Sequence, residues 1–541
     1  MLSHSRLRKS FSKVTTKPLS VPFAEPPTGE QRFRPPKPKK PWNETVVANT
    51  LSPACYQGRD MYNTTFWGSE MWNHNTASNL TVMVWLFGGG YYSGSPSLIL
   101  YDGKALALLG NVIVVNVNYR VGPFGYLYMD DEDAPGNAGM LDQQLALYWI
   151  RDNIFNFGGN PSRVTVFGES AGAASVVAHL IAPGSENLFK NGILQSGSLD
   201  NKWSMDTPSR ALDKGHQLAE LVGCNRTEVK ETIACLRSAP AQLLVDNIWS
   251  LNLNFLEFPF VIVSRDRNFF RHKDGFTSLR TGHYAHDVNL MFGINHDEGN
   301  FWNIYNLANY FDKSEQPELN RNEFHDCVER AFAFQPELVR SAAKHVYSDP
   351  NCTDPNRQSQ FYAEQVNQMV GDYFFTCDSI WLADQFRKDE SRSGKVYIYY
   401  FDQPSSANPW PKWTGVMHGY EIEYVFGVPI YNESAGYTKR EQVLSDKIIQ
   451  YWSSFATDGI PRLRDRKSTD IWPEYDGVNN TRWMLLKGGS HIKPMPSRKK
   501  VECDLWRTAK DMEYNSYKIE LQLSSAFRIS TTSALIMLIF S

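Results

Sequence analysis

The sequence lacks the features that mark several large classes of protein. None of its seven cysteines forms a C-x-x-C pair, which argues against zinc and thioredoxin-like redox sites. No stretch has enough consecutive apolar residues to span a bilayer. The net charge is only -3, too small to indicate binding of nucleic acid. We therefore predict no metal site, no cofactor and no nucleic-acid partner.

An internal repeat and a Pro/Gly/Ser-rich linker are also lacking, so we predict one large domain over residues 20–510. Residues 1–19 are basic, rich in serine and free of acidic residues, and no apolar signal-peptide core follows. We expect this segment to be poorly ordered. Residues 511–541 form a tail in which small residues, a polar spacer and a short apolar run resemble a lipid-anchor signal.

Glycosylation sequons are frequent in the sequence. They begin at Asn43, Asn63, Asn79, Asn225, Asn351, Asn432 and Asn479. Each N-x-S/T triplet alone is weak evidence, but together with the cysteines they favour a secretory route. We predict a disulfide-bonded glycoprotein.

Apolar runs alternate with a helical pattern in the first half of the chain. Buried strands are predicted at 80–87, 111–120 and 162–168, with a helix over 141–157 before the third strand. Later strands are predicted at 288–295 and 395–402. This order indicates an α/β protein with a large, mostly parallel central sheet flanked by helices.

A G-x-S-x-G sequence surrounds Ser170, between a predicted strand and the helical run AGAASVVAHLI. This strand–turn–helix setting is typical of a nucleophile elbow, in which the amide of the next residue, Ala171, faces a developing oxyanion. More oxyanion donors are expected from the glycines at 88–90, which follow the strand at 80–87.

Elbow hydrolases place an acid and then a histidine after the serine in the chain. By spacing alone, both Asp297 and Glu298 fit the acid, because both follow the predicted strand at 288–295. Two loop histidines, His418 and His491, fit the base, and the residues by themselves do not separate them.

Seven ordered motifs occur along the chain, namely VPFAEPPTGEQRFRPP, WLFGGGYYSGS, NYRVGPFGYL, APGNAGMLDQQLAL, FGGNPSRVTVFGESAG, GINHDEGNFW and HGYEIEYVFG. In these motifs, from about Val21 to about Lys510, the chain resembles the cholinesterase and carboxylesterase family, and within it the acetylcholinesterases. The resemblance implies the α/β-hydrolase fold. It also implies a catalytic triad of Ser170, Glu298 and His418, and an oxyanion hole made by the amides of Gly89, Gly90 and Ala171.

The same resemblance implies that the chain is a serine esterase that hydrolyses choline esters, acetylcholine foremost, through an acyl-enzyme. It further implies a secreted protein or one on the outer face of the plasma membrane, at synapses. The sequence leaves open whether the chain forms a homodimer held by packed helices. The alternatives are a general carboxylesterase and a catalytically impaired homologue.

The family's substrate-binding positions map onto eight residues here. Trp72, Glu169 and Phe301 match the choline subsite, where an indole can hold a quaternary ammonium. Tyr92, Tyr305 and Asp60 match positions at the mouth of the site. Leu256 and Phe258 match the acyl pocket, and leucine at the first of these positions, which is often aromatic in the family, should loosen that pocket.

Two departures from the family concern the chain's architecture. The family's N-terminal strand region, and a strand with the pattern S-E-D-C-L-x-L-N before residue 80, are missing, and we interpret both as segments lost through gene prediction or splicing. Loss of a strand should expose a sheet edge. The family pattern implies disulfides Cys224–Cys235 and Cys377–Cys503; Cys327 and Cys352 have no counterpart, so we expect them to pair, with Cys55 left over.

Overall fold

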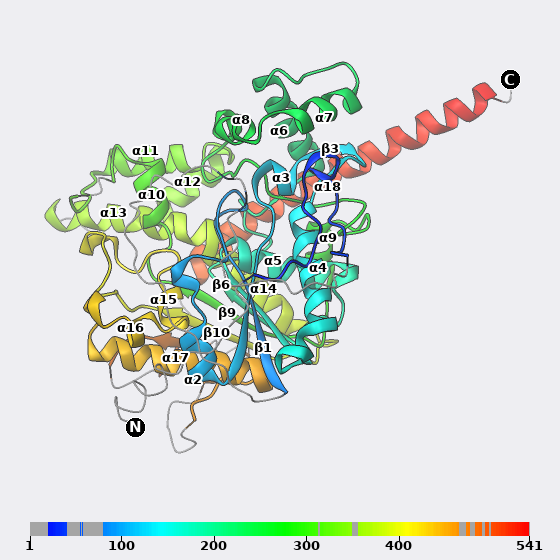
Figure 1. The fold of residues 1–541 in the computed structure, drawn as a ribbon. Coiled ribbons are helices and arrows are strands. Elements are labelled where there is room, and N and C mark those ends of the chain that lie inside the picture. Colours follow the sequence, from blue (N-terminus) through cyan, green and yellow to red (C-terminus); the bar gives the residue numbers. More distant parts are fainter. Residues whose placement is uncertain are drawn as a thin grey trace.

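A mostly parallel β-sheet forms the centre of the protein (Figure 1). The structure, a computed structural model, describes residues 20–40, 55, 57, 79–311, 314–348, 355–464, 472–476, 482–489, 493–496 and 499–539. Within these residues the sheet has eight strands in the order β12-β11-β10-β9-β6-β5-β1-β2, and every neighbouring pair is parallel except β11 and β12. The strands are β1 (Leu80–Leu86), β2 (Val112–Val117), β5 (Gly159–Glu169), β6 (Asn191–Gln195), β9 (Asn289–Asn295), β10 (Val396–Phe401), β11 (Arg482–Leu486) and β12 (Lys493–Pro496).

Two short strand pairs lie outside this sheet. The strands β3 (Tyr128–Asp131) and β4 (Ala134–Pro135) are antiparallel, whereas β7 (Met205–Asp206) and β8 (Ile262–Val263) are parallel. The second pair brings the segment after β6 beside the residues that follow Phe258.

Helices cover both faces of the sheet. On one face α4, α5 and α14 pack against the strands, and on the other α17 packs against β1 and β5 together with α2 (Figure 1). The helices are α2 (Lys104–Gly110), α3 (Gly122–Tyr126), α4 (Ala138–Asn153), α5 (Ala171–Ile181), α6 (Pro208–Leu221), α7 (Val229–Ser238), α8 (Ala241–Asn247), α9 (Gly275–Thr281), α10 (Asn300–Asn306), α11 (Arg321–Ala331), α12 (Glu337–Val346), α13 (Pro355–Gly371), α14 (Cys377–Lys388), α15 (Ile422–Val425), α16 (Val428–Tyr431), α17 (Lys439–Asp458) and α18 (Lys500–Ile539).

The predicted fold class is confirmed. All five predicted strands form, and the predicted helix over 141–157 is the main part of α4 with a 3-10 turn after it. The runs are apolar without alternation because a parallel sheet covered by helices is buried on both faces. In β1, for example, Val82 to Leu86 are all fully buried.

One edge of the described sheet is β2, which pairs only with β1 there, and the other edge is β12. Its residues Ile113 to Asn116 are half-buried, unlike their neighbours in β1. That the missing family motif exposes a sheet edge stays a prediction, because no residue of β2 is fully exposed and the segment before residue 79 lies largely outside the described residues.

The C-terminal helix α18 runs without a break through residue 510, the predicted end of the catalytic domain. Trp506 and Tyr517, on either side of that position, are both buried. Figure 1 shows the far end of α18 extending away from the body of the molecule. Among the described residues, no helix combines the length and apolar character that a membrane span requires.

Candidate active site

Ser170 occupies a sharp turn between β5 and α5. Its backbone has φ 56° and ψ -121°, a conformation that is strained for a residue with a side chain and that is typical of functional sites. Helix α5 starts in contact with β1, so that a Cβ on Gly172 would lie 1.9 Å from the carbonyl oxygen of Leu86. The strand, turn and helix predicted around G-x-S-x-G therefore form, and they hold Ser170 at the carboxyl edge of the sheet.

His418 and Glu298 are brought together by two paired loops. The loop after β9 and the loop before α15 form a parallel bridge, in which the Asp297 amide donates to the Val416 carbonyl over 3.0 Å. As a result, Nδ1 of His418 lies 2.7 Å from Oε2 of Glu298. Glu298, and not Asp297, is the acid that contacts this histidine. His491 lies outside the described residues.

The second ring nitrogen of His418 faces the carboxylate of Glu169. Nε2 is buried and forms no hydrogen bond with any described residue, Ser170 included. It lies 3.1 Å from Oε1 of Glu169, the residue next to Ser170. Hydrogen bonds between a nucleophile and its base often tighten only when substrate binds. The missing bond to Ser170 is therefore compatible with His418 as the base.

The buried carboxylates around His418 set its charge. Burial lowers the pKa of His418, but Glu169, Glu298 and Glu421 outweigh that effect and raise the pKa to about 9. Burial also raises the pKa of Glu169 to about 8, which the neighbouring His418 opposes only in part. Burial therefore opposes the negative charge that the sequence predicts on Glu169.

Sequence reasoning missed Glu421 as part of this network. Its carboxylate accepts hydrogen bonds from Gln195 over 2.9 Å and from Asn295 over 2.7 Å. The sequence could have indicated this role, because Glu421 ends the motif H-G-Y-E that begins with His418.

The glycine loop after β1 lies over the nucleophile. A Cβ on Gly88 would be 2.5 Å from a carboxylate oxygen of Glu169 and 3.1 Å from the Cβ of Ser170. Among the described residues, the amides of Gly89, Gly90 and Ala171 donate no hydrogen bond. Three backbone donors without acceptors beside a serine suit the binding of an oxyanion.

Aromatic rings enclose the His418 imidazole. Ring centroids lie 4.5 Å away for Phe375 and 5.5 Å for Trp302, and Trp302 in turn lies 5.6 Å from Phe258. Trp203 packs against Phe258 at 5.9 Å. Of these rings only Phe258 was predicted. Phe375 belongs to a π-helical turn between α13 and α14, a distortion that often marks functional sites but leaves no clear sequence pattern.

The predicted acyl-pocket residues are both buried, Leu256 with 4% and Phe258 with 3% of the side chain surface exposed. Phe258 also lies against the glycine loop, because a Cβ on Gly90 would be 2.9 Å from its ring. The structure thus brings one side of the predicted pocket to the predicted oxyanion donors.

Two chains of aromatic contacts lead from this region to the surface. One runs from Trp302 to Phe301 at 5.0 Å and on to Tyr305 at 5.4 Å, and Tyr305 is 37% exposed. The other runs from Phe258 to Tyr92 at 5.1 Å and on to Trp249 at 4.8 Å.

Trp249 is 53% exposed and lies in the 3-10 turn that follows α8. Sequence reasoning missed it. The predicted residues Phe301, Tyr305 and Tyr92 are therefore connected to the site through ring contacts. Trp72 and Asp60 lie outside the described residues.

The cysteines follow the prediction in part. Disulfides join Cys224 to Cys235 and Cys377 to Cys503, as predicted. The expected bond from Cys327 is wrong, because Cys327 is a free thiol. Its side chain lies on the buried face of α11, where it packs as a small apolar group. Its expected partner Cys352 lies outside the described residues, and Cys55 is free, as expected.

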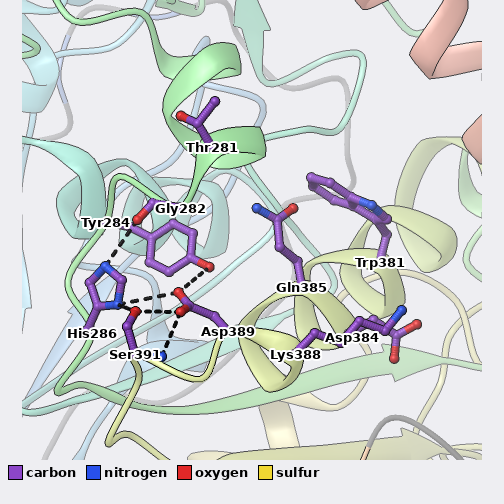
Figure 2. Close-up of a pocket in the computed structure, with 10 residues that line it drawn as sticks. All are labelled: Thr281, Gly282, Tyr284, His286, Trp381, Asp384, Gln385, Lys388, Asp389 and Ser391. Atoms are coloured by element: carbon purple, nitrogen blue, oxygen red, sulfur yellow. Dashed lines mark hydrogen bonds and ion pairs between the residues drawn. The ribbon is translucent and has the colours of Figure 1, made fainter.

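A separate pocket of about 470 Å³ contains another Ser, His and Asp (Figure 2). There, Ser391 Oγ lies 2.7 Å and Asp389 Oδ2 3.3 Å from the same nitrogen of His286, Nδ1. The other nitrogen, Nε2, meets the Gly282 carbonyl at 3.0 Å. A working triad needs the acid and the nucleophile on opposite nitrogens, so this group is not a second hydrolytic site.

Comparison with known proteins agrees with the site geometry. Residues 9–506 match the carboxylesterase family. The chain is 56% identical over 548 residues to acetylcholinesterase 4 of Caenorhabditis briggsae, covering 96% of this chain and 90% of that protein.

The chain is also 39% identical over 508 residues to the acetylcholinesterase of Bungarus fasciatus, covering 90% and 82% of the two chains. To acetylcholinesterase 1 of Caenorhabditis elegans it is 35% identical over 540 residues, covering 91% and 85%. The chain therefore belongs to the carboxylesterase family and is a carboxylic ester hydrolase.

Proposed function

We propose that this enzyme hydrolyses choline esters, with acetylcholine as its principal substrate, to choline and the free acid. The observation that carries the proposal is the geometry of His418, which binds Glu298 through Nδ1 and keeps a buried Nε2 beside the Glu169–Ser170 turn. The acetylcholinesterases among its relatives support the choice of substrate.

In the proposed mechanism Ser170 attacks the ester carbonyl while His418 accepts its proton, and Glu298 holds the imidazole in the correct orientation. The oxyanion is stabilised by the amides of Gly89, Gly90 and Ala171. His418 then returns the proton to the choline oxygen, which leaves. Water hydrolyses the acyl-enzyme by the same steps and frees Ser170.

The choline end of the substrate is assigned to Trp72, Phe301 and Glu169. A quaternary ammonium ion near Glu169 would favour the ionised carboxylate and so offset the effect of burial on its pKa. Trp72 supplies the cation–π surface in this proposal, worth about 2 kcal/mol when desolvated. Tyr92, Tyr305 and Asp60 are assigned to the path by which substrate enters.

A general carboxylesterase is the second candidate, and Leu256 favours it. A leucine in place of an aromatic ring enlarges the acyl side of the site. Phe258 and Trp302 argue against this second candidate. Their rings pack against each other beside His418 and fill the acyl side of the site. The acyl groups that the enzyme accepts therefore decide between the two candidates.

The test is hydrolysis of acetylthiocholine, butyrylthiocholine and an uncharged phenyl ester by the full chain, made in a secretory host. We expect acetylthiocholine to be the best substrate and Ser170→Ala to abolish hydrolysis of all three. In Trp72→Ala, the charged esters should lose far more activity than the phenyl ester. Equal losses would refute the choline subsite, and a folded wild type that neither turns over nor reacts with an organophosphate would refute the esterase assignment.

We also propose that the enzyme acts outside the cell, at synapses. Two disulfides support export, since such bonds persist in oxidising compartments, and the sequons at Asn79 and Asn225 are exposed. Attachment by a lipid at the C-terminal tail and a homodimer formed through helices complete the proposal. Release by a phospholipase and sedimentation of the purified chain test these two points.

A further inference from the structure

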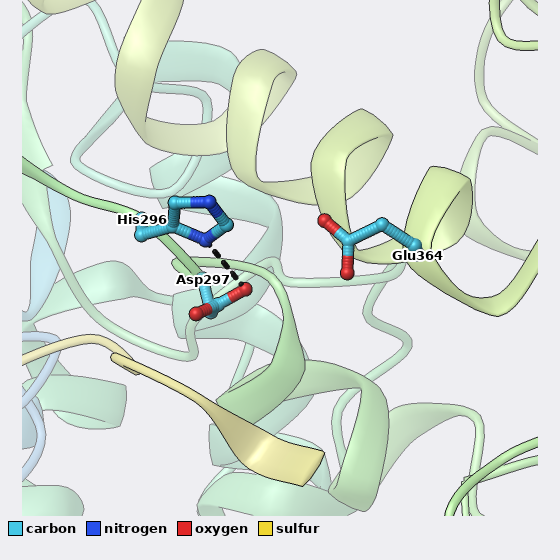
Figure 3. A group of neighbouring side chains, drawn as sticks. All are labelled: His296, Asp297 and Glu364. Atoms are coloured by element: carbon cyan, nitrogen blue, oxygen red, sulfur yellow. Dashed lines mark ion pairs between the residues drawn. The ribbon is translucent and has the colours of Figure 1, made fainter. Parts of the chain in front are cut away.

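A histidine and two carboxylates converge outside the proposed triad (Figure 3). His296 and Asp297 directly follow β9, whereas Glu364 comes from α13, and Figure 3 shows its carboxylate turned toward the other two side chains. Nδ1 of His296 lies 2.9 Å from Oδ1 of Asp297. One potential ligand atom from each of the three residues lies within 4.8 Å of the others.

This spacing is close to that of a metal site. Two atoms bound to one Zn²⁺ can be at most about 4 Å apart, because each bond is about 2.0–2.2 Å long. Any pair of ligand atoms beyond that distance would have to move closer together when the ion binds.

Within the described part of the chain, the cationic partner of this pair of carboxylates is His296, which lies 2.9 Å from Asp297. Among the described residues, neither Asp297 nor Glu364 forms an ion pair with a lysine or arginine. The neighbouring cation Lys499 instead contacts Asp372 and the side chain oxygen of Gln368. Asp297 is also only 7% exposed, so water screens its charge poorly.

Asn367 provides an independent sign of a missing ligand. Its side chain is only 1% exposed, and Nδ2 lies 2.8 Å from Asp297 Oδ1 and 3.4 Å from each Glu364 oxygen. Its Oδ1 has no hydrogen-bond partner among the described residues. A half-turn of the amide would direct that oxygen at the two carboxylates. Without a cation this arrangement is unfavourable, because all of these oxygens are acceptors, but around a cation it is favourable.

We propose that His296, Asp297 and Glu364, with the amide oxygen of Asn367, bind one divalent transition-metal ion of the Zn²⁺ type. One imidazole nitrogen with carboxylate and amide oxygens suits such an ion, whereas Ca²⁺ and Mg²⁺ prefer oxygen ligands alone. Our prediction of no metal site rested on cysteine spacing, which cannot detect ligands contributed by two distant segments.

The test is Zn²⁺ binding to the chelator-treated, untagged full chain, followed by calorimetry. The variants His296→Ala and Glu364→Gln each remove one ligand. The matched controls His345→Ala and Glu337→Gln remove exposed residues of α12. Thermal unfolding is measured for all four variants. If His296→Ala is misfolded, the comparison rests on Glu364→Gln, which keeps the shape of the side chain.

We expect the wild type and both controls to bind one Zn²⁺ per chain, and each ligand variant to bind it at least tenfold more weakly. Equal affinity in Glu364→Gln and the wild type would overturn the proposal. So would a wild type that shows no saturable binding. Both readouts are independent of ester hydrolysis, so they stand even if the proposed substrate is wrong.

Discussion

At the residue scale, hydrogen bonds separate two adjacent carboxylates that spacing alone leaves equivalent and that only the family resemblance distinguishes. Glu298 contacts Nδ1 of His418, whereas Asp297 accepts hydrogen bonds from the Val416 amide over 2.7 Å and from Asn367. The first residue therefore orients the proposed base, and the second holds the loop that carries it.

Glu298→Gln should lower kcat by about 10⁴, the loss typical of a triad whose acid is removed, because the imidazole is no longer held in the correct tautomer. Asp297→Asn is the matched control, since it makes the same chemical change one residue away. Its loss should be much smaller. Steady-state kinetics on acetylthiocholine measure both, and a larger loss in Asp297→Asn would contradict the assigned acid.

Glu169 should control the pH dependence of the enzyme. His418 accepts a proton only when neutral, so kcat/KM rises as pH increases through its pKa, which the neighbouring carboxylates raise to about 9. Glu169→Gln removes the largest of the raising interactions. The acidic limb of the kcat/KM profile should therefore move to lower pH.

An uncharged phenyl ester is the substrate for that measurement, so that loss of cation binding does not distort the profile. A limb that stays in place, or moves to higher pH, would show that Glu169 does not set the pKa of His418.

At the element scale, the loop after β1 depends on a backbone that only glycine readily adopts. Gly90 has φ 56°, and a Cβ there would lie 2.5 Å from the Tyr92 ring. Any side chain at this position would displace the proposed oxyanion donors or the neighbouring rings.

Gly90→Ala should therefore reduce kcat by about 10²–10³, the usual cost of losing one oxyanion donor. Gly436→Ala is the control, because Gly436 has φ 82° but a Cβ there would meet no atom within 4 Å, so only backbone strain is introduced. It should lower stability slightly and leave kcat unchanged. Equal kcat values for the two variants would argue against the role of this loop.

At the scale of the whole molecule, α18 is fastened to the domain by covalent and ionic links. Cys503 is bonded to Cys377 in α14, and Lys510 contacts Asp378 in the same helix. Arg507 lies 3.3 Å from Asp200, which follows β6. The C-terminal helix is thus tied to the end of a central strand.

Removing the Cys377–Cys503 bond should cost more stability than removing Cys224–Cys235. The sequence separations are 126 and 11 residues. In the chain-entropy model they correspond to about 5 and about 3 kcal/mol of the free energy of unfolding. Denaturant unfolding of the two double Cys→Ser variants measures the difference, and a reversed order would show that native contacts, not loop length, dominate.

Much of the fold was predictable because its signals are local. Continuous apolar runs predicted β1, β2, β5, β9 and β10, and the run after Ser170 coincides with α5. The strand β6, with the sequence NGILQ, was missed because two apolar side chains do not distinguish a strand from a helix or loop.

The sequence by itself determined the elbow, since a strand, two glycines around Ser170 and a helix are adjacent in the chain. It also narrowed the acid to two neighbours and the base to two loops. The family resemblance then selected Glu298 and His418, and the tertiary structure places them in contact. Only the tertiary structure showed that Trp302 and Phe375 enclose the imidazole and that Glu364 lies near His296 and Asp297. These contacts join residues far apart in sequence, and they depend on loop pairing and helix packing that no local pattern records.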